Sequence, residues 1–293
     1  MMSILKTNMS TMKVLIFVVL SACMVLVVLK LRCTDDHARW IASTGSATDL
    51  DFVPAAPNRL SDCDELFGPD TAASAFQLSA EFHAGFAAFD AAVNESVIAE
   101  GGYYEGNSFG MATQFKLMHY LASRPNVRSI CETGFNLGHS SFNYLTANRH
   151  AIVHTFDIGF HQYAHTMATF LLARFPGRLF VHFGDSTQTV PAFARENPNH
   201  RCDFLYVDGG HTYPVAMADL LNFAAMADLD AGNIIMFDDY PALAWYSRPI
   251  GWAWENMCRW GYVRELMRCS HAKSEYKRGF VIGIVVRRPH LSF

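Results

Sequence analysis

The sequence predicts an α/β fold in which a doubly wound, mostly parallel sheet of seven strands lies between two layers of helices. The first observation behind this prediction is that, after Pro125, short apolar runs alternate with helical stretches. Parallel strands need a crossover of about a dozen residues, and helices of this length supply it. The second is that the final two apolar runs have no helix between them, which predicts an antiparallel last strand at one edge.

The expected strands are short and apolar. They lie at 127–131, 152–156, 179–183, 204–207, 234–237, 262–267 and 280–286, with helices expected at 139–147, 161–174, 188–195, 213–227 and 249–260. Ahead of them, apolar residues at helical spacing predict one helix over roughly 75–97 and another that ends before Pro125.

The composition excludes several classes of protein. The chain has 293 residues, of which 51% are hydrophobic and 17% charged, with a mean hydropathy of +0.10. This is the composition of a chain with a sizeable core rather than of a disordered one. The net charge of −4 leaves no basic excess for a phosphate backbone, so no nucleic-acid partner is expected.

An apolar run near the N-terminus predicts a membrane anchor. Residues 14–29 read VLIFVVLSACMVLVVL and carry no charge, and Lys13 and Lys30 flank them. A bilayer core needs about 20 apolar residues, with a lower limit near 17, so a span over 14–31 is expected if Lys30 snorkels to the interface. A cleaved signal peptide is an alternative, although no small-x-small cleavage site follows the run. A lipoprotein signal at Cys23 is a third.

This anchor divides the chain into four parts. We expect a short tail (1–13), a transmembrane signal-anchor (14–31), a stem or linker (32–74) and a folded domain (75–293). The basic charges on the two sides of the span are nearly balanced. The short basic tail before a large domain favours a cytosolic tail and a luminal domain. The short span favours the thin membranes of the endoplasmic reticulum or Golgi.

The cysteines fit an oxidising compartment without fixing a pairing. Cys33 with Cys63, or Cys258 with Cys269, could form a disulfide there. Cys131 and Cys202 lie in apolar, strand-like runs and are expected to be buried thiols.

Acidic residues stand at the ends of five consecutive predicted strands. They are Glu132, Asp157, Asp185, Asp208 and Asp238, and Asp239 follows the last of them. Because ligands of such sheets bind beyond the carboxyl ends of the strands, we expect these acids to share one rim. Asp also caps helices, so one or two of them could be caps.

The loop after the first strand favours a nucleoside ligand without pyrophosphate. Gly134 and Gly138 allow a tight turn and a close approach of the backbone to a ligand. Asn136 stands where a dinucleotide-binding loop has the glycine that makes room for pyrophosphate. Asp157, 23 residues after Gly134, is placed to accept hydrogen bonds from ribose hydroxyls.

The motifs ETGFNLGHSS, FDIG, GDS, VDGGHTY and FDDY, in this order and spacing, resemble the class I S-adenosylmethionine-dependent methyltransferases. Within that class the chain is most similar, over residues 102–286, to macrocin-type sugar O-methyltransferases and the broad methyltransferase domain 24 group. The resemblance implies a Rossmann-like sheet of seven strands with the last one antiparallel. It implies S-adenosylmethionine as cofactor, with its methionine part near Glu132, Gly134, Asn136 and Gly138, its ribose at Asp157 and its adenine near Asp185 and Ser186.

The remaining acids predict a metal site. The fourth and fifth strands are neighbours in this fold, about 4.8 Å apart, so Asp208, Asp238 and Asp239 converge. Clustered carboxylates need a cation, a shared proton or hydrogen-bonding neighbours. Related metal-dependent methyltransferases place Mg²⁺ there, and an all-oxygen ligand set suits that ion.

Two residues of this region are candidates for catalysis. His211, three residues after Asp208, is a candidate general base, with Asp208 beside it. The alternative is that His211 only orients its loop or hydrogen-bonds Asp208.

The leading hypothesis is therefore methyl transfer to a hydroxyl group, with Mg²⁺ as an assisting ion. A luminal domain favours a glycan acceptor, whereas a cytosolic one favours a lipid or phenolic small molecule. A membrane-anchored binding or scaffold protein that kept the fold without the chemistry is the alternative. A nicotinamide oxidoreductase is disfavoured because Asn136 replaces the middle glycine and no Tyr-x-x-x-Lys pair is evident. The sequence leaves the acceptor and the oligomeric state open.

Overall fold

The structure is a computed structural model that describes residues 61–63, 77–104, 106, 108–241, 248–271 and 278–291. All of them belong to one compact unit, Thr48–Phe293. The predicted tail, the predicted anchor over 14–31 and most of the predicted stem lie outside the described residues. Within the described ranges, none of the helices has the length and apolarity that a bilayer crossing requires.

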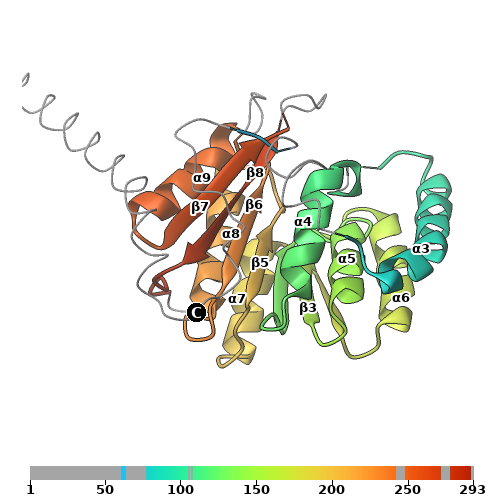
Figure 1. Cartoon of the computed structure of the whole chain (residues 1–293), viewed down its shortest axis with the longest axis horizontal. Coiled ribbons are helices and arrows are strands. Elements are labelled where there is room, and N and C mark those ends of the chain that lie inside the picture. Colours follow the sequence, from blue (N-terminus) through green and yellow to red (C-terminus); the bar gives the residue numbers. More distant parts are fainter. Residues whose placement is uncertain are drawn as a thin grey trace, which may run out of the picture. The chain divides into compact units, whose positions relative to one another are not determined.

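The described residues form one sheet with the strand order β1-β7-β8-β6-β5-β2-β3-β4 (Figure 1). Its strands are β1 (Ser61–Asp62), β2 (Ser129–Thr133), β3 (Ile152–Asp157), β4 (Leu179–Phe183), β5 (Phe204–Val207), β6 (Ile234–Asp238), β7 (Val263–Ser270) and β8 (Gly279–Val285). β8 lies between β6 and β7 and is antiparallel to both, while the other neighbouring strands are parallel. The predicted doubly wound sheet with an antiparallel last strand is confirmed, but the described residues form eight strands rather than the predicted seven, because β1 joins the sheet from the segment predicted to be a stem.

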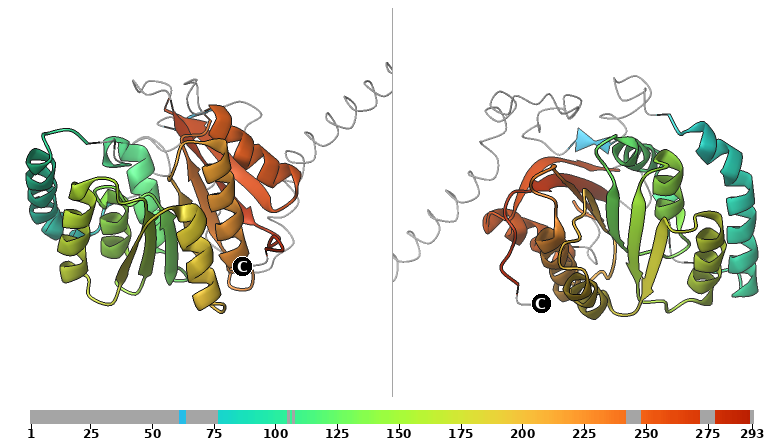
Figure 2. Two further views of the ribbon diagram at one scale, coloured as in Figure 1. Left: turned by 180° about the vertical axis from the view of Figure 1, so that it is seen from behind. Right: turned by 90° about the horizontal axis from the view of Figure 1, so that it is seen from below.

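Helices cover both faces of this sheet, as Figure 2 shows. One layer contains α3 (Ala80–Ala99), α4 (Ala112–Ser123), α5 (His139–Ala147) and α6 (Gln162–Arg174), with the short 3-10 helix η2 (Ser108–Gly110) before α4. The other contains α7 (Ser186–Glu196), α8 (Tyr213–Met226) and α9 (Arg248–Arg259). The main hydrophobic core lies between the first layer and the sheet.

Hydrogen bonds connect the end of α3 to the start of α6, and they position one side of the candidate functional site described below. Glu100, which follows α3, accepts hydrogen bonds from the backbone N–H groups of Gln162 (3.3 Å) and Tyr163 (2.8 Å). These donors, chiefly that of Tyr163, lower the pKa of Glu100, and nearby His161 contributes. A carboxylate at a helix N-terminus satisfies orphan N–H groups and interacts favourably with the helix dipole.

The fold reaches back into the segment that the sequence assigns to a stem. Ser61 and Asp62 form β1 and pair in parallel with Cys269 and Ser270 at the end of β7. This pairing brings Cys63 next to Cys269, and the two form a disulfide across 206 residues of chain. Closing a loop of this length stabilises the fold by about 5 kcal/mol on a chain-entropy estimate.

The cysteine predictions need correction. Cys63 is bonded to Cys269, so neither the Cys33–Cys63 nor the Cys258–Cys269 pairing forms. Cys131 and Cys202 are buried as predicted, but they are bonded to each other rather than free thiols. The reason is that β2 and β5 are neighbours in the sheet although 71 residues separate the two cysteines. Cys258 is buried and belongs to neither of these two disulfides.

Candidate functional site

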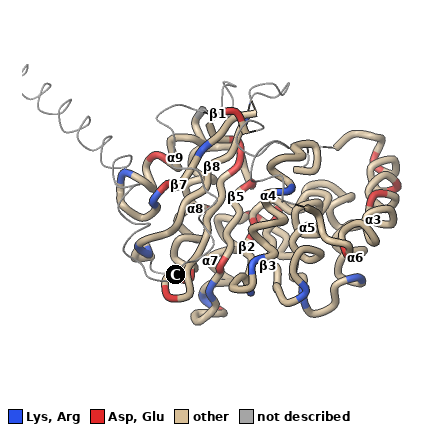
Figure 3. Tube along the Cα trace, in the orientation of Figure 1, with Lys and Arg blue, Asp and Glu red and all other residues tan. Residues whose placement is uncertain are grey.

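A cavity of about 660 Å³ lies at the carboxyl ends of the central strands. Its wall comprises residues that follow β2 to β6, together with Met111 and Gln114 of the α4 region and Arg278 just before β8. The strand order reverses between β2 and β5, and this switch point is where open α/β sheets bind ligands. In Figure 3, acidic positions lie at the centre of the fold, beside the label of β5, as well as on the outer helices. The volume is typical of a small-molecule site.

Most of the predicted site residues line this cavity, and three do not. Those that line it are Gly134, Asn136, Asp157, Asp185, Ser186, Asp208, His211 and Asp238. Glu132 and Asp239 are buried behind the wall, at 0% and 1% exposure, and Gly138 is not part of it either.

The loop between β2 and α5 is shaped by three residues in the left-handed region, Gly134, Asn136 and Gly138. Gly134 has φ 93°, and a Cβ there would overlap the carbonyl oxygen of Asp208, so only glycine fits. Asn136 has φ 49°, which asparagine tolerates better than most residues. Its backbone N–H donates to Asp157 Oδ2 (2.8 Å) and its side-chain amide donates to the carbonyl of Gly106 (2.7 Å). Asn136 thus joins three segments of the cavity wall.

Gly138 has a packing role rather than a place in the wall. It has φ 76° and precedes α5 as its N-cap. A Cβ at this position would lie 2.6 Å from Leu171 Cδ1 and 2.9 Å from the ring of Phe135. The glycine therefore lets α5 start close to α6.

Asp157 and Asp185 also serve the local backbone. Asp157 accepts from the backbone N–H groups of Asn136 and Gly159, each at 2.8 Å, and so fixes the end of β3. Asp185 Oδ1 accepts from the backbone N–H (2.9 Å) and hydroxyl (2.7 Å) of Thr187 and is the N-cap of α7. Each carboxylate retains acceptor capacity toward the cavity that it lines.

Glu132 lies beneath the loop, on the same side of the sheet as Tyr206, its register partner on β5. Ser141 Oγ donates to its Oε2 at 2.7 Å, whereas Oε1 is buried and has no hydrogen-bond donor among the described residues. Burial raises the pKa of Glu132 to about 7, although nearby hydroxyls of Ser140 and Ser141 offset part of the effect. An orphaned oxygen under a cavity is suited to a donor that a ligand brings.

The acids after β5 and β6 converge on the hydroxyl of Tyr206. This hydroxyl lies 2.7 Å from Asp238 Oδ2 and 3.2 Å from Asp208 Oδ2, and it donates to these carboxylates. Asp238 Oδ1 accepts from the backbone N–H of Asp239 at 2.8 Å. Burial raises the pKa of Asp208 well above its ordinary value, and the charges of Asp238 and Asp239 raise it further, against the opposing effect of Arg278.

Asp239 is held in the left-handed region, with φ 58°, between two basic side chains. Arg278 Nη1 donates to its Oδ1 at 2.9 Å, and His211 Nε2 lies 3.0 Å from its Oδ2. Burial raises the pKa of Asp239, as does the charge of Asp238, and Arg278 and His211 counteract this. Strained backbone of this kind persists where the surroundings enforce it, as at functional sites.

The group that could hold a metal ion differs from the predicted one. Asp208, His211 and Asp239 each offer a ligand atom, and these atoms lie within 4.8 Å of one another. Asp238, which the prediction included, has one oxygen bound by Tyr206 and the other by the backbone of Asp239. Its place in the group is taken by His211, whose side chain is 52% exposed at the cavity.

Arg278 and Tyr206 are the functional residues that sequence reasoning missed. Tyr206 carries a signal, since it stands two residues before Asp208 and strand alternation puts it on the same face. Arg278 is the cation that three converging acids require, but nothing local in the sequence distinguishes it from the Arg287–Arg288 pair after the last strand.

Comparison with known proteins supports one class of function. Residues 131–240 match the family described as a methyltransferase domain. Comparison with curated protein sequences found no significant match.

Similar solved structures include three O-methyltransferases. That from Bacillus cereus in complex with SAH has a TM-score of 0.55 and 16% identity, covering 68% of this chain and 90% of that one. TomG from Streptomyces achromogenes, which is involved in tomaymycin synthesis and is in complex with SAM, has a TM-score of 0.54 and 17% identity over 68% and 90%. A putative O-methyltransferase from Klebsiella pneumoniae has a TM-score of 0.53 and 17% identity over 72% and 98%. At these identities the likeness establishes a shared fold.

Replacement of Glu132 by Gln is expected to change the pH dependence of stability. The pKa of Glu132 is about 7 in the folded protein against an ordinary 4.5, so the folded state retains a proton that the unfolded state loses. Stability from this group is fully present below pH 4.5 and is lost as the pH rises through about 7, by roughly 3 kcal/mol. In urea unfolding, the free energy of unfolding of wild type should fall between about pH 5 and about pH 8 relative to that of Glu132→Gln. Parallel pH profiles for the two proteins would contradict the assignment.

Proposed function

We propose that this chain is a class I S-adenosylmethionine-dependent methyltransferase that transfers a methyl group to a hydroxyl oxygen of a glycan or small-molecule acceptor, and the match of residues 131–240 to a methyltransferase domain supports this. One observation carries the proposal. The same cavity is lined by Asp157 at the end of β3 and by Asp208 and His211 after β5, and Oδ2 of the buried Asp239 lies 3.0 Å from His211 Nε2. A nucleoside-binding acid and a proton-accepting group thus share one space.

The residues of the cavity fit S-adenosylmethionine. Asp157 offers a carboxylate to ribose hydroxyls, and the positions of Gly134 and Asn136 suit a backbone that contacts the ligand closely. Asp185 and Ser186 line the cavity at the start of α7, and we assign them to the adenine of the cofactor. When bound, the cofactor would supply a sulfonium methyl group, whose carbon a nucleophilic oxygen can attack while S-adenosylhomocysteine leaves.

The chain's own residues would prepare the acceptor. The carboxylate of Asp239, 3.0 Å from His211 Nε2, holds the imidazole ring in place, and Arg278 favours the ionised form of that carboxylate. His211 then accepts the hydroxyl proton of the acceptor at a ring nitrogen. Asp208, half-buried at the cavity, hydrogen-bonds the same hydroxyl and orients it. Orientation supplies much of the rate enhancement in reactions of this type.

We also propose Mg²⁺ as an assisting ion, held by Asp208 and Asp239. Two carboxylates are the donors that this hard cation prefers, and a cation would relieve the repulsion that raises the pKa of Asp208. The imidazole of His211 is the weaker donor of the group, so it remains available as base. When bound, Mg²⁺ supplies Lewis acidity that lowers the pKa of a coordinated hydroxyl.

Binding of S-adenosylmethionine by the full chain, measured by calorimetry with and without Mg²⁺, tests the proposal. Wild type should bind, and Asp157→Ala should lose at least about tenfold in affinity, or about 1.4 kcal/mol, because the ribose loses its acceptor. Asp230→Ala, at an exposed acid that does not line the cavity, is the matched control and should bind as wild type does. Failure of wild type to bind would leave the non-catalytic scaffold alternative. Equal binding by Asp157→Ala would remove the ribose assignment.

The role of His211 is tested by turnover, followed as S-adenosylhomocysteine release with a panel of hydroxyl acceptors. His211→Gln should lower kcat by about 10²-fold or more, since general base catalysis contributes that much, and leave cofactor affinity unchanged. His290→Gln is the control, because His290 is exposed and follows the C-terminal end of β8, which is antiparallel to β6 and so ends away from the cavity. Turnover that persists in EDTA would contradict the proposed role of Mg²⁺. Full activity of His211→Gln would contradict the proposal that His211 is the general base.

For the location of the protein, we propose a single-pass anchor at 14–31 with the catalytic domain in the lumen of the endoplasmic reticulum or Golgi. The two disulfides, Cys63–Cys269 and Cys131–Cys202, support an oxidising compartment.

Sealed microsomes that contain the full chain should protect the catalytic domain from added protease until detergent opens them, because the domain is expected on the luminal side. Protease digestion is followed with an antibody against the C-terminal region, and a cytosolic marker protein on the same membranes is the control. Digestion of the domain without detergent would reverse the proposed orientation.

A further inference from the structure

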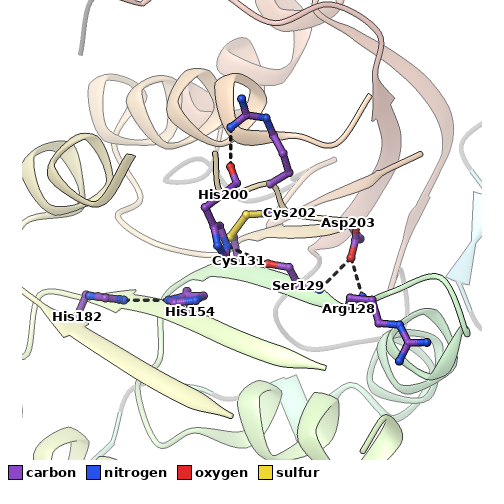
Figure 4. Close-up of a disulfide and its surroundings, with 9 residues drawn as sticks. Arg128, Ser129, Cys131, His154, His182, His200, Cys202 and Asp203 are labelled. Atoms are coloured by element: carbon purple, nitrogen blue, oxygen red, sulfur yellow. Dashed lines mark hydrogen bonds between the residues drawn. A yellow bond between two sulfur atoms is a disulfide. The ribbon is translucent and has the colours of Figure 1, made fainter. Parts of the chain in front are cut away.

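Cysteine and histidine side chains gather at a second place, away from the cavity. Cys131 of β2 and Cys202, just before β5, form their disulfide beside His200 (Figure 4). One ligand atom from each of these three residues lies within 4.8 Å of the other two. None of the three lines the cavity. The cluster is therefore separate from the proposed reaction.

Strand register adds a further imidazole to this cluster. His154 of β3 is the register partner of Cys131, so the two side chains lie on the same face of the sheet. The ring of His154 is 4.7 Å from the ring of His200, between centroids. On its other side, His154 Nδ1 lies 3.3 Å from His182 Nε2. A row of imidazoles thus continues from the disulfide across β3 and β4, as Figure 4 shows.

His200 is held in position by a polar contact of the kind that orients metal-bound histidines. Its Nε2 lies 2.9 Å from Ser129 Oγ. Ser129 is itself fixed, since its backbone N–H donates to Asp203 Oδ2 at 2.9 Å. Hydrogen bonds of this type set the tautomer and the ring orientation of histidine ligands.

The donor types at this cluster suit zinc. Imidazole and thiolate together form the ligand set that Zn²⁺ prefers.

We propose that reduction of this disulfide creates a zinc site in which Cys131, Cys202 and His200 bind the ion and His154 is the fourth ligand. This goes beyond the proposed function and does not rest on it. Two thiolates on a tetrahedral zinc lie about 3.7 Å apart, from Zn–S bonds of about 2.3 Å. The two Cα atoms are 5.9 Å apart, so rotation of the cysteine side chains can accommodate the ion between the strands.

The disulfide state and the zinc-bound state of the site interconvert by thiol–disulfide exchange. A dithiol reductant transfers two electrons and two protons to the S–S bond, which yields two thiols and the reductant's own disulfide. Zn²⁺ binding then releases the two thiol protons to solvent as the Zn–S bonds form. An oxidised glutathione-type disulfide takes two electrons from the thiolates, the S–S bond re-forms and the ion leaves. The redox poise of the compartment thus selects the metal or the disulfide.

Cobalt is the probe for the first test, because a thiolate-bound Co²⁺ gives a charge-transfer absorption that carboxylate and imidazole ligands do not. The full chain is reduced with a phosphine, stripped with EDTA and titrated with Co²⁺ and then Zn²⁺. Reduced wild type should show the thiolate band with a single equivalent of Co²⁺, and Zn²⁺ should abolish it. The chain oxidised with glutathione disulfide should show no band. The Asp208–His211–Asp239 group cannot produce this signal, since it contains no sulfur.

Variants and a labelling experiment separate a metal site from a packed disulfide. Cys131→Ser and Cys202→Ser should lose the band, His200→Ala should weaken Co²⁺ binding at least about tenfold, and the control Cys258→Ser should behave as wild type. If the cysteine variants fail to fold, alkylation of reduced wild type decides, because Zn²⁺ should slow labelling of Cys131 and Cys202 about tenfold and leave Cys258 unchanged. Absence of the band in reduced wild type, its persistence in Cys131→Ser, or labelling indifferent to Zn²⁺ would each overturn the proposal.

Discussion

The site depends on how the fold compensates the clustered negative charge of Asp208, Asp238 and Asp239. Parallel neighbours β5 and β6 bring these acids to the same edge, where unpaired carboxylates would be costly. Compensation comes from the hydroxyl of Tyr206 and from the guanidinium of Arg278. Arg278 reaches this edge because β8 is antiparallel, so that its first residues lie beside the last residues of β6, with Phe280 opposite Asp238. The reversed last strand therefore supplies the cation that the parallel strands require.

This constraint explains what the sequence could predict and what it could not. Strand polarity alone places Asp157, Asp185, Asp208 and Asp238 at one edge, and that much follows from the order of apolar runs and helices. The partner of Asp239 depends instead on the register between β6 and β8, which no local pattern encodes. The disulfides were unpredictable for the same reason. Each joins a strand to a residue beside a neighbouring strand that is distant in sequence.

Alternation along β2 separates two chemistries that lie next to each other in sequence. Glu132 faces the helical layer of α5 and accepts a hydrogen bond from Ser141, so it lies under the loop between β2 and α5 rather than on the cavity wall. Cys131, one residue earlier, faces the other layer and meets Cys202 and His200. Because successive side chains point to opposite faces, one strand serves the cavity and the cysteine–histidine cluster without contact between them. Asp185, in contrast, has two roles at one position, because it lines the cavity and is also the N-cap of α7.

The two regions still share a mechanical link, because both depend on the pairing of β2 with β5. Beyond the ends of these strands, Gly134 packs so closely on the carbonyl of Asp208 that a single Cβ would separate them. A disulfide between Cys131 and Cys202 fastens this pair of strands at its other end. A zinc ion held by the same two sulfurs would fasten it as well. Exchange between the two states would therefore alter whether the protein carries zinc at this place, while the β2–β5 contact, and with it the floor of the cavity, stays formed.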